Sequence, residues 1–582
     1  MKPLFRSILV IVSLCAACGC REQPPGAIPP VPPAITGSAS PGPPAGEAKG
    51  LRFVECAKDW GVHVEYRDGS ERGFFAILES LGGGVGVLDY DRDGLSDLFF
   101  PQGGDFEPTK HPFGNPSRLL RQVSAAPQPS FSDVSSDSGS ARAPHFSHGC
   151  AVTDYDNDGF DDVLVTGYGG VELFHNLGDG TFVEVSQPSG LTDTQWSSSA
   201  AWGDFNGDGA NDIYIAHYVD WSPEHDPPCF FRDGQTREVC PPREFSGLPD
   251  IVYLSDGAGG FFAPGKAFGE VSEGKGLGVV TADIDLDGDL DVYVTNDTVM
   301  NSLLENEEHK KLVEKGPSSG TGFGDTGRAD GSMGVDVGDF NGDGLPDIWV
   351  TNYENETFAL YRSHDGKFFQ HVSRSTGIAA AGGMSVGWGT VFADLDLDGD
   401  EDLFVGNGHV IRHPTNSPLQ QRPLVLRNEE FKRYVDVASQ AGEYATSPHM
   451  SRGVACSDLD RDGDLDLIVS HVNQPAAVLR NESDRAGQWV EVELIGTKSS
   501  RWSEGAWVEF RTANQKQIRL KKGGTSYAST SDRRLHAGLE KATQVDSLTV
   551  HWPSGHVDQF QNIAAGQRVI LVEGHSQVQS LP

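Results

Sequence analysis

The sequence predicts an all-β protein: a seven-bladed β-propeller followed by a small β-rich domain. Three observations lead to this prediction. An acidic nine-residue motif occurs seven times, each copy runs directly into a short apolar, β-branched or aromatic segment, and the copies are about 61 residues apart. Such segments read as buried strands, so each motif sits inside a β-hairpin. Four strands per repeat, arranged radially, make a propeller blade.

The motif places oxygen-bearing side chains at positions 1, 3, 5 and 9 and a glycine at position 6. In the first copy these are Asp89, Asp91, Asp93 and Asp97, with Gly94 at the turn. Carboxylates on alternate residues, with the backbone carbonyl of position 7, can surround one hard cation. Ca²⁺ takes six to eight oxygens in irregular geometry, so we predict up to seven Ca²⁺ sites. An EF-hand is excluded, because the flanking segments are strands and position 12 is Phe100 rather than glutamate.

The seven copies are called loops 1 to 7 in chain order. Their predicted ligands are Asp89, Asp91, Asp93, Leu95 and Asp97 in loop 1; Asp154, Asp156, Asp158, Phe160 and Asp162 in loop 2; Asp204, Asn206, Asp208, Ala210 and Asp212 in loop 3; Asp283, Asp285, Asp287, Asp289 and Asp291 in loop 4; Asp339, Asn341, Asp343, Leu345 and Asp347 in loop 5; Asp394, Asp396, Asp398, Asp400 and Asp402 in loop 6; Asp458, Asp460, Asp462, Asp464 and Asp466 in loop 7. Loops 3 and 5 should bind most weakly, because an asparagine replaces one carboxylate in each.

The first fifty residues read as an export and attachment segment. Residues 1–20 combine Lys2 and Arg6 with a short apolar run and small residues, which is the pattern of a signal peptide. Cys18 and Cys20 each follow small residues as in a bacterial lipobox, and either one is the candidate lipidated cysteine. Residues 21–50 are rich in proline and predict an extended, disordered linker. We therefore expect an exported protein that is lipid-anchored to a bacterial membrane, in the periplasm or at the cell surface.

Residues 51–487 form the predicted propeller. A glycine-rich strand enters each loop, a hydrophobic strand leaves it, and a fourth strand begins with an aromatic residue in several repeats. The segment 53–56 has this fourth-strand pattern but precedes the first repeat, whereas the last repeat has no clear copy. We predict that 53–56 completes the last blade.

In residues 488–575, apolar and polar residues alternate, which predicts a small β-rich domain. Residues 576–582 are predicted to be a C-terminal tail.

Charge and cysteines narrow the classes of function. The chain has 83 acidic and 45 basic residues, a formal net charge of −38, which argues against nucleic acid as a partner. Cys229 and Cys240 bracket a short loop and should form a disulfide in an oxidising compartment. Cys56, Cys150 and Cys456 lie on apolar segments and are expected to be buried thiols.

The motifs resemble those of a known family. The loops are similar to FG-GAP/VCBS repeats, the calcium-binding units also seen in integrin α chains. The tail, with Arg519, Gly523, Leu539 and the segment 545–555, is similar to the ASPIC/UnbV domain. This domain order is that of the cartilage acidic protein family and its bacterial relatives. The resemblance implies an extracytoplasmic, calcium-stabilised binding role and no known catalytic residues.

The sequence favours a membrane-anchored scaffold that binds a protein or polysaccharide partner without turnover. The alternative is a calcium-dependent polysaccharide lyase or hydrolase on a propeller scaffold. A G-x-S-x-G pattern at 383–387 lacks the helix that a nucleophile elbow requires, because the chain continues into loop 6. Histidines beside the strands, which could gather at one mouth of a propeller, are His145, His148, His217, His409 and His449.

Overall fold

The computed structural model describes residues 50–125, 128–484 and 487–581. Cys18, Cys20 and the predicted signal peptide lie outside the described residues. Over the described ranges, no helix has the length and apolar character needed to cross a membrane. The prediction of an all-β, propeller-like fold is confirmed.

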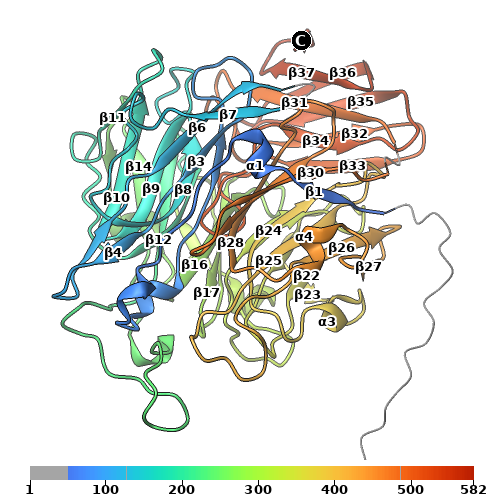
Figure 1. The fold of residues 1–582 in the computed structure, drawn as a ribbon. Helices are drawn as coiled ribbons and strands as arrows, with labels where there is room; N and C mark the ends of the chain where they lie inside the picture. The colour runs from blue at the N-terminus through green and yellow to red at the C-terminus, as the bar shows by residue number, and fades with distance from the viewer. Residues whose placement is uncertain (1–49, 126–127, 485–486, 582) are drawn as a thin grey trace, which may run out of the picture. The chain divides into compact units, whose positions relative to one another are not determined.

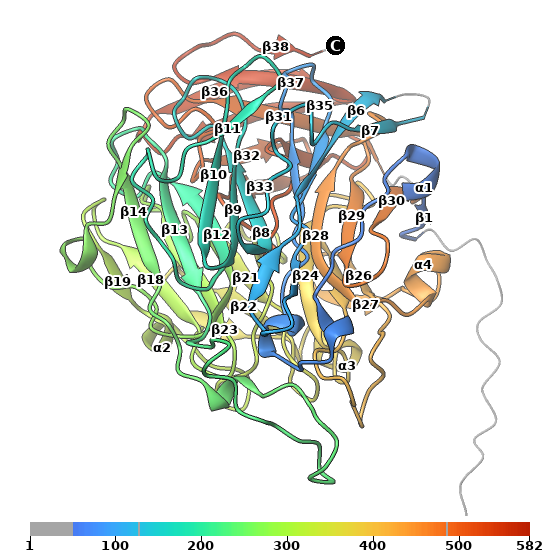
Figure 2. The same ribbon diagram turned by 60° about the vertical axis from the view of Figure 1, so that its left-hand side comes forward.

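Between Phe53 and Asn481 the described part of the chain forms seven four-stranded antiparallel sheets (Figures 1 and 2). Their strands, in the order in which they pair, are β2 (Gly86–Leu88), β3 (Asp97–Phe100), β6 (Arg118–Ser124) and β7 (Ser130–Asp133); β8 (Phe146–Thr153), β9 (Asp162–Tyr168), β10 (Gly170–Asn176) and β11 (Phe182–Glu184); β12 (Ser197–Gly203), β13 (Asp212–His217), β14 (Ile251–Ser255) and β15 (Phe261–Phe262); β16 (Gly276–Ala282), β17 (Asp291–Asn296), β18 (Ser302–Asn306) and β19 (Leu312–Glu314); β20 (Val335–Gly338), β21 (Asp347–Val350), β22 (Ala359–Ser363) and β23 (Phe369–His371); β24 (Gly387–Ala393), β25 (Asp402–Asn407), β26 (Leu424–Glu429) and β27 (Arg433–Asp436); β28 (Ser451–Ser457), β29 (Asp466–His471), β30 (Ala477–Asn481) and β1 (Phe53–Glu55).

Helices are short and lie in connections. They are α1 (Ala57–Trp60), α2 (Gly316–Ser319), α3 (Ile378–Ala381) and α4 (Glu443–Thr446), with 3₁₀ turns η1 (Ser70–Arg72), η2 (Ile77–Ser80), η3 (Pro242–Glu244) and η4 (Gly265–Phe268). A two-stranded hairpin, β4 (Gly104–Phe106) and β5 (Pro112–Gly114), is inserted between β3 and β6.

The inner strands are buried on both faces because the sheets stack against one another. Every residue of β21 is buried, and so is every residue of β17. The first strands of successive sheets pack together in chain order from β2 to β28, and β28 also packs against β2. β1 pairs antiparallel with β30 as the fourth strand of the last sheet, so the segment 53–56 lies where its sequence pattern predicted.

The C-terminal domain consists of two four-stranded sheets with one hydrophobic core between them. One sheet contains β34 (Leu535–Gly538), β31 (Trp489–Ile495), β37 (Gln567–Val572) and β38 (Gln579–Ser580); the other contains β33 (Lys516–Leu520), β32 (Trp507–Arg511), β35 (Gln544–His551) and β36 (Val557–Ala564). Within the segment 576–582, β38 pairs with β37 and so extends the sheet.

The connection between β33 and β34, residues 521–534, is named the axial loop. It leaves the C-terminal domain and hydrogen-bonds to the first-strand segment of all seven sheets. Backbone or side-chain atoms of the axial loop bond with Val85 and Val87, Cys150, Trp202, Thr281, Val335, Thr390 and Cys456. At its tip Tyr527 is fully buried, its ring centroid lies 4.7 Å from that of Trp388, and its hydroxyl accepts the N–H of Gly82. Gly84 is required beside it, because a Cβ there would lie 1.9 Å from the carbonyl oxygen of Ala528.

Candidate metal centres

The seven loops share one backbone conformation. Each joins the first and second strands of its sheet, as the sequence predicted. The glycine at position 6 has a φ of 82° to 99° in every loop, a left-handed conformation that side chains other than glycine rarely adopt. Position 4 is also left-handed in every loop, with a φ of 56° to 72°. Only loops 3 and 5 carry glycine at position 4, so this second turn was not evident from the motif.

Two aspartates in each loop form the same hydrogen bonds in all seven. Position 1 accepts the N–H of the position 6 glycine through Oδ2, at 2.7–3.1 Å. Position 9 accepts the N–H of position 2 through Oδ2, at 2.9–3.2 Å. Its Oδ1 accepts a backbone N–H from the third strand of the sheet, at 2.7–2.8 Å. Position 9 therefore fixes the loop to its sheet.

Position 5 completes this frame. Its Oδ1 accepts the N–H of position 7 in all seven loops, at 2.9–3.1 Å. The carboxylates are thereby turned toward one another. Within loops 1, 2, 4 and 6, sets of three ligand atoms lie within 4.8 Å of each other: Asp89, Asp91 and Asp97; Asp154, Asp156 and Asp158; Asp283, Asp285 and Asp291; and Asp394, Asp396 and Asp402.

The electrostatics of the loops favour a bound cation. Burial, reinforced by Asp162, raises the pKa of Asp154 to about 8, and burial with Asp285 raises that of Asp283 to about 8. Burial likewise raises the pKa of Asp212 to about 8. Clustered carboxylates of this kind ionise at neutral pH only when a positive charge compensates them.

Unpartnered oxygens point to the same conclusion. The position 1 aspartate has an Oδ1 atom that is buried and without a hydrogen-bond partner in four loops: Asp89, Asp154, Asp283 and Asp394. In loops 3, 5 and 7 that atom instead accepts the N–H of position 5. An all-oxygen donor set with unused lone pairs fits Ca²⁺. Ligation by the predicted residues, including the weaker binding of loops 3 and 5, stays a prediction.

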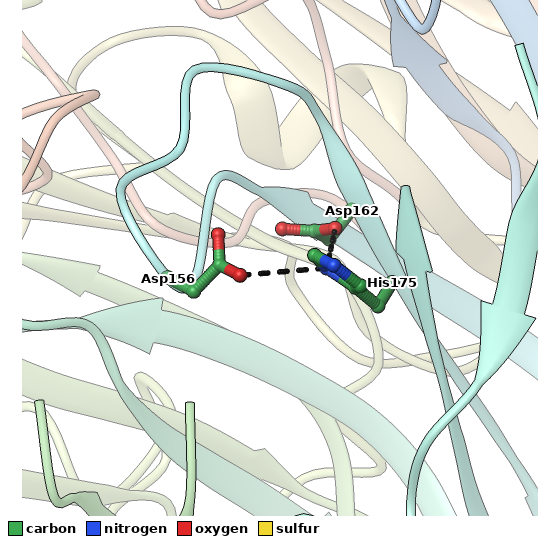
Figure 3. A group of neighbouring side chains, drawn as sticks. All are labelled: Asp156, Asp162 and His175. Atoms are coloured by element: carbon green, nitrogen blue, oxygen red, sulfur yellow. Dashed lines mark ion pairs between the residues drawn. The ribbon is translucent and has the colours of Figure 1, made fainter. Parts of the chain in front are cut away.

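In each sheet, one residue of the third strand lies beside the loop. It directly precedes the residue whose backbone N–H donates to the position 9 carboxylate. The sequence motif did not reveal this position. In chain order its occupants are Arg121, His175, Leu254, Glu305, Arg362, Arg427 and Arg480. In loop 1 the guanidinium of Arg121 donates to Asp91 at 2.6 Å and to Asp93 at 3.0 Å. Figure 3 shows His175 at the corresponding place beside Asp156 and Asp162.

The C-terminal domain lies over the end of the sheets that carries the loops (Figure 2). Its basic side chains reach loop carboxylates directly. Arg568 donates to Asp458 at 2.7 Å, and Arg533 lies 3.7 Å from Asp89. Arg533 also donates to Asp161 at 2.9 Å, an acidic residue outside the predicted ligand set. This contact arises from the packing of two distant segments, so no spacing in the sequence could have indicated it.

Two of the candidate histidines are held by their own structural partners. His148 is buried, and its Nε2 accepts the indole N–H of Trp196 at 2.7 Å. His217 lies 3.2 Å from Asp193 and 2.6 Å from the carbonyl oxygen of Pro249. The pattern at 383–387 leads into β24, a strand, and not into a helix.

Cys229 and Cys240, the pair predicted from the sequence, are joined by a disulfide. Cys56, Cys150 and Cys456 are free thiols; the first two are buried and Cys456 is half-buried.

Comparisons with known proteins agree with this architecture. Residues 154–215, 283–350 and 339–405 match the FG-GAP-like repeat, and residues 496–578 match the ASPIC and UnbV domain. Cartilage acidic protein 1 of Xenopus tropicalis is 26% identical over 473 residues, which cover 70% of this chain and 71% of that protein. The Homo sapiens protein of the same name is 25% identical over 488 residues, covering 73% of this chain and 71% of that protein.

A solved structure, the BP39L lectin of Burkholderia pseudomallei, matches with a TM-score of 0.43 and 9% identity, covering 69% of this chain and 96% of that chain. The family resemblance predicted from the sequence is confirmed: the chain carries FG-GAP-like repeats followed by a C-terminal ASPIC and UnbV domain, and it is related to cartilage acidic protein 1 over 70% of its length.

Proposed function

We propose that this protein is an exported, calcium-binding, propeller-like scaffold that holds a protein or polysaccharide partner without chemical turnover. The observation that carries the proposal is the common frame of the seven loops. Fourteen aspartates, at positions 1 and 9, make the same backbone hydrogen bonds in every loop and turn carboxylates inward. When Ca²⁺ is bound, these loops stabilise the sheets. When Ca²⁺ is absent, their carboxylates repel one another.

The covered end of the sheets supports a proposal for the surface that the partner uses. The C-terminal domain occupies the end that carries the loops, so that end is unavailable to a large ligand. In an antiparallel sheet the connections between second and third strands lie at the opposite end. Three of these are long: 101–117 with the β4–β5 hairpin, 218–250 with its disulfide, and 408–423. We assign the partner surface to that end, where Phe230 keeps 49% of its surface exposed.

Attachment to a membrane is part of the proposal. The lipobox-like residues Cys18 and Cys20 and the proline-rich linker 21–50 support it. A thioether-linked diacylglycerol with a further amide-linked acyl chain buries enough methylenes, at about 0.8 kcal/mol each, for stable anchoring. Replacing both cysteines by serine should move the protein from the membrane fraction to the soluble one, and a variant that stays in the membrane fraction contradicts the anchor.

A glycan array with the full chain, read in Ca²⁺ and in excess chelator, tests the binding role. We expect a ligand that binds in Ca²⁺ and is lost in chelator, and that is recovered intact after long incubation. Recovery of shortened or unsaturated oligosaccharides would show that the alternative, a polysaccharide lyase or hydrolase, is correct. The same assay repeated with immobilised extracellular proteins covers the protein partner.

A further inference from the structure

In loop 2 an imidazole from the third strand lies beside the carboxylates at positions 3 and 9 (Figure 3). Loop 4 also has a neighbouring imidazole, but there His309 contacts the position 7 side chain, Asp289, at 2.9 Å. His175 lies on β10, and its Nδ1 is 3.3 Å from Oδ1 of Asp162 and 3.5 Å from Oδ2 of Asp156. These three ligand atoms all lie within 4.8 Å of one another. Nδ1 has no hydrogen-bond partner in this arrangement, although it is buried. Nδ1 therefore faces two carboxylate oxygens, and in its unprotonated form it offers a lone pair to an ion held between them.

A second, independent feature points into the same space. Asp154 is fully buried, and its Oδ1 has no hydrogen-bond partner. Asp154, Asp156 and Asp158 also bring their ligand atoms within 4.8 Å of one another. Loop 2 thus gathers four carboxylates and one imidazole. The side chains of His175 and Asp156 each remain 22% exposed, so an ion can enter from solvent.

At the corresponding third-strand position, loop 2 is the one loop of the seven that has a histidine. Arginine stands there beside loops 1, 5, 6 and 7, leucine beside loop 3 and glutamate beside loop 4. Arginine keeps its proton at every accessible pH and cannot ligate a metal. Leucine has no donor atom, and glutamate adds one more hard oxygen. Histidine alone supplies a neutral nitrogen ligand, through Nδ1, while Nε2 keeps its proton toward solvent.

Ligand chemistry decides which ion this set prefers. Ca²⁺ takes oxygen ligands almost entirely, whereas Zn²⁺ binds imidazole nitrogen together with aspartate oxygen. At a metal–ligand distance of about 2.1 Å, the edge of a tetrahedron of ligands is about 3.4 Å long. The two distances from Nδ1 of His175, 3.3 and 3.5 Å, are close to the length of that edge.

We propose that loop 2 is a Zn²⁺ site, in which His175, Asp156 and Asp162 hold the ion together with an oxygen of Asp154 or Asp158, in place of the Ca²⁺ bound by the other loops. This inference rests on the proposal that the loops bind metal ions, and it specifies the ion for one of them. The competing explanation is that protonated His175 acts as a counter-ion, as Arg121 does in loop 1.

The test uses the full chain, freed of metal and titrated with Zn²⁺ in the presence of saturating Ca²⁺. We expect one equivalent of Zn²⁺ to bind, displacing one Ca²⁺ as measured by elemental analysis. Co²⁺ serves as a spectroscopic substitute, with a visible d–d band of tetrahedral intensity. Both signals should require His175.

The decisive variants are His175→Arg and His175→Gln. Arginine preserves a counter-ion at this position and removes the ligand, so it separates the two explanations. In both variants we expect Zn²⁺ affinity to fall by about 100-fold or more, because even loss of a group that supports a ligand costs 10- to 100-fold. Arg362→Gln, at the same strand position beside loop 5, is the matched control and should leave Zn²⁺ binding unchanged.

Melting curves in Ca²⁺ establish that the variants fold. Equal Zn²⁺ affinity in the native protein and His175→Arg overturns the zinc assignment, even if Ca²⁺ binds every loop. Absence of bound Ca²⁺ from the native protein overturns the calcium proposal instead, whatever the Zn²⁺ result. The two failures are therefore distinguishable in one experiment.

Discussion

The aspartate at position 9 serves two partners at once in each loop. In loop 4, Asp291 accepts the N–H of Ile284 at 3.1 Å and the N–H of Asn306 at 2.8 Å. It is nearly fully buried, and burial together with Asp285 holds its pKa well above the usual range. Its negative charge is therefore costly unless a cation is near. The contribution of this side chain to the free energy of unfolding therefore depends on whether Ca²⁺ is present.

We predict that Asp291→Asn changes stability differently in the two conditions. In saturating Ca²⁺ the variant loses a ligand and a charged acceptor, and its free energy of unfolding should fall by about 3 kcal/mol. In excess chelator the neutral amide removes a buried repulsive charge, so the loss should shrink by at least half. Urea unfolding in both buffers measures the difference.

Asp287→Asn is the matched control, because Asp287 belongs to the same loop but is exposed and accepts one local N–H from Asp289. Its cost should be smaller in Ca²⁺ and close to zero in chelator. An equal cost of Asp291→Asn in the two buffers would contradict a role for this carboxylate in metal binding.

At the scale of the loop, the sequence predicted the hairpins but not the turn at position 4 or the neighbouring third-strand residue. The spacing of aspartates and the glycine at position 6 are local, so they identified the hairpins, their strands and the inward carboxylates. The left-handed residue at position 4 was hidden, because Arg92, Asn157 and Leu286 adopt this conformation without being glycine. His175 was missed for a different reason: it comes from another strand, and only the register of the sheet brings it to the loop.

The loops should reverse the pH dependence of stability when Ca²⁺ is removed. Without Ca²⁺, burial raises the pKa of Asp154, Asp212 and Asp283 to about 8, against about 3.9 in an unfolded chain. The folded state then binds more protons than the unfolded state between about pH 4 and pH 8, so stability in chelator should fall as pH rises through that window.

With Ca²⁺ bound the same carboxylates are ionised, and protons compete with the metal. Stability in excess Ca²⁺ should therefore fall as pH decreases from about 7 to about 5, with the opposite slope. Thermal melting across this range, with and without chelator, checks both slopes. Parallel curves would show that the carboxylates do not exchange protons for metal.

The last sheet depends on a strand from the other end of the chain. β1 covers the edge of β30; Phe53 in it is 2% exposed and donates its backbone N–H to Ala441 at 3.0 Å. Deleting 51–58 should lower the free energy of unfolding by about 4 kcal/mol or more, because it removes buried apolar side chains and an edge ladder. Deleting 22–45 should leave the melting temperature unchanged. Equal behaviour of the two truncations would contradict this role of β1.

At the scale of the whole molecule, the axial loop joins two regions that the sequence presented as separate domains. Most of its residues between 523 and 532 are small and polar, including Gly523, Gly524, Ser526 and Ser529, so the loop has neither strand alternation nor an apolar stretch. Their partners are the first strands of seven sheets, which become neighbours only once those sheets pack together. The domains were therefore predictable from local pattern, whereas the connection between them was not.

This connection predicts that the propeller-like region and the C-terminal domain unfold together. Tyr527 packs on Trp388 and is fully buried, so Tyr527→Ala should lower the free energy of unfolding by about 3–5 kcal/mol. Tyr527→Phe keeps the ring and removes only the hydroxyl that accepts from Gly82, and should cost about 1 kcal/mol. Calorimetry in Ca²⁺ should show one transition for the native protein and for both variants. The melting temperature should fall slightly in Tyr527→Phe and further in Tyr527→Ala. Two separate transitions, with only the C-terminal one moved by Tyr527→Ala, would show that the axial loop fills the centre of the sheets without coupling them.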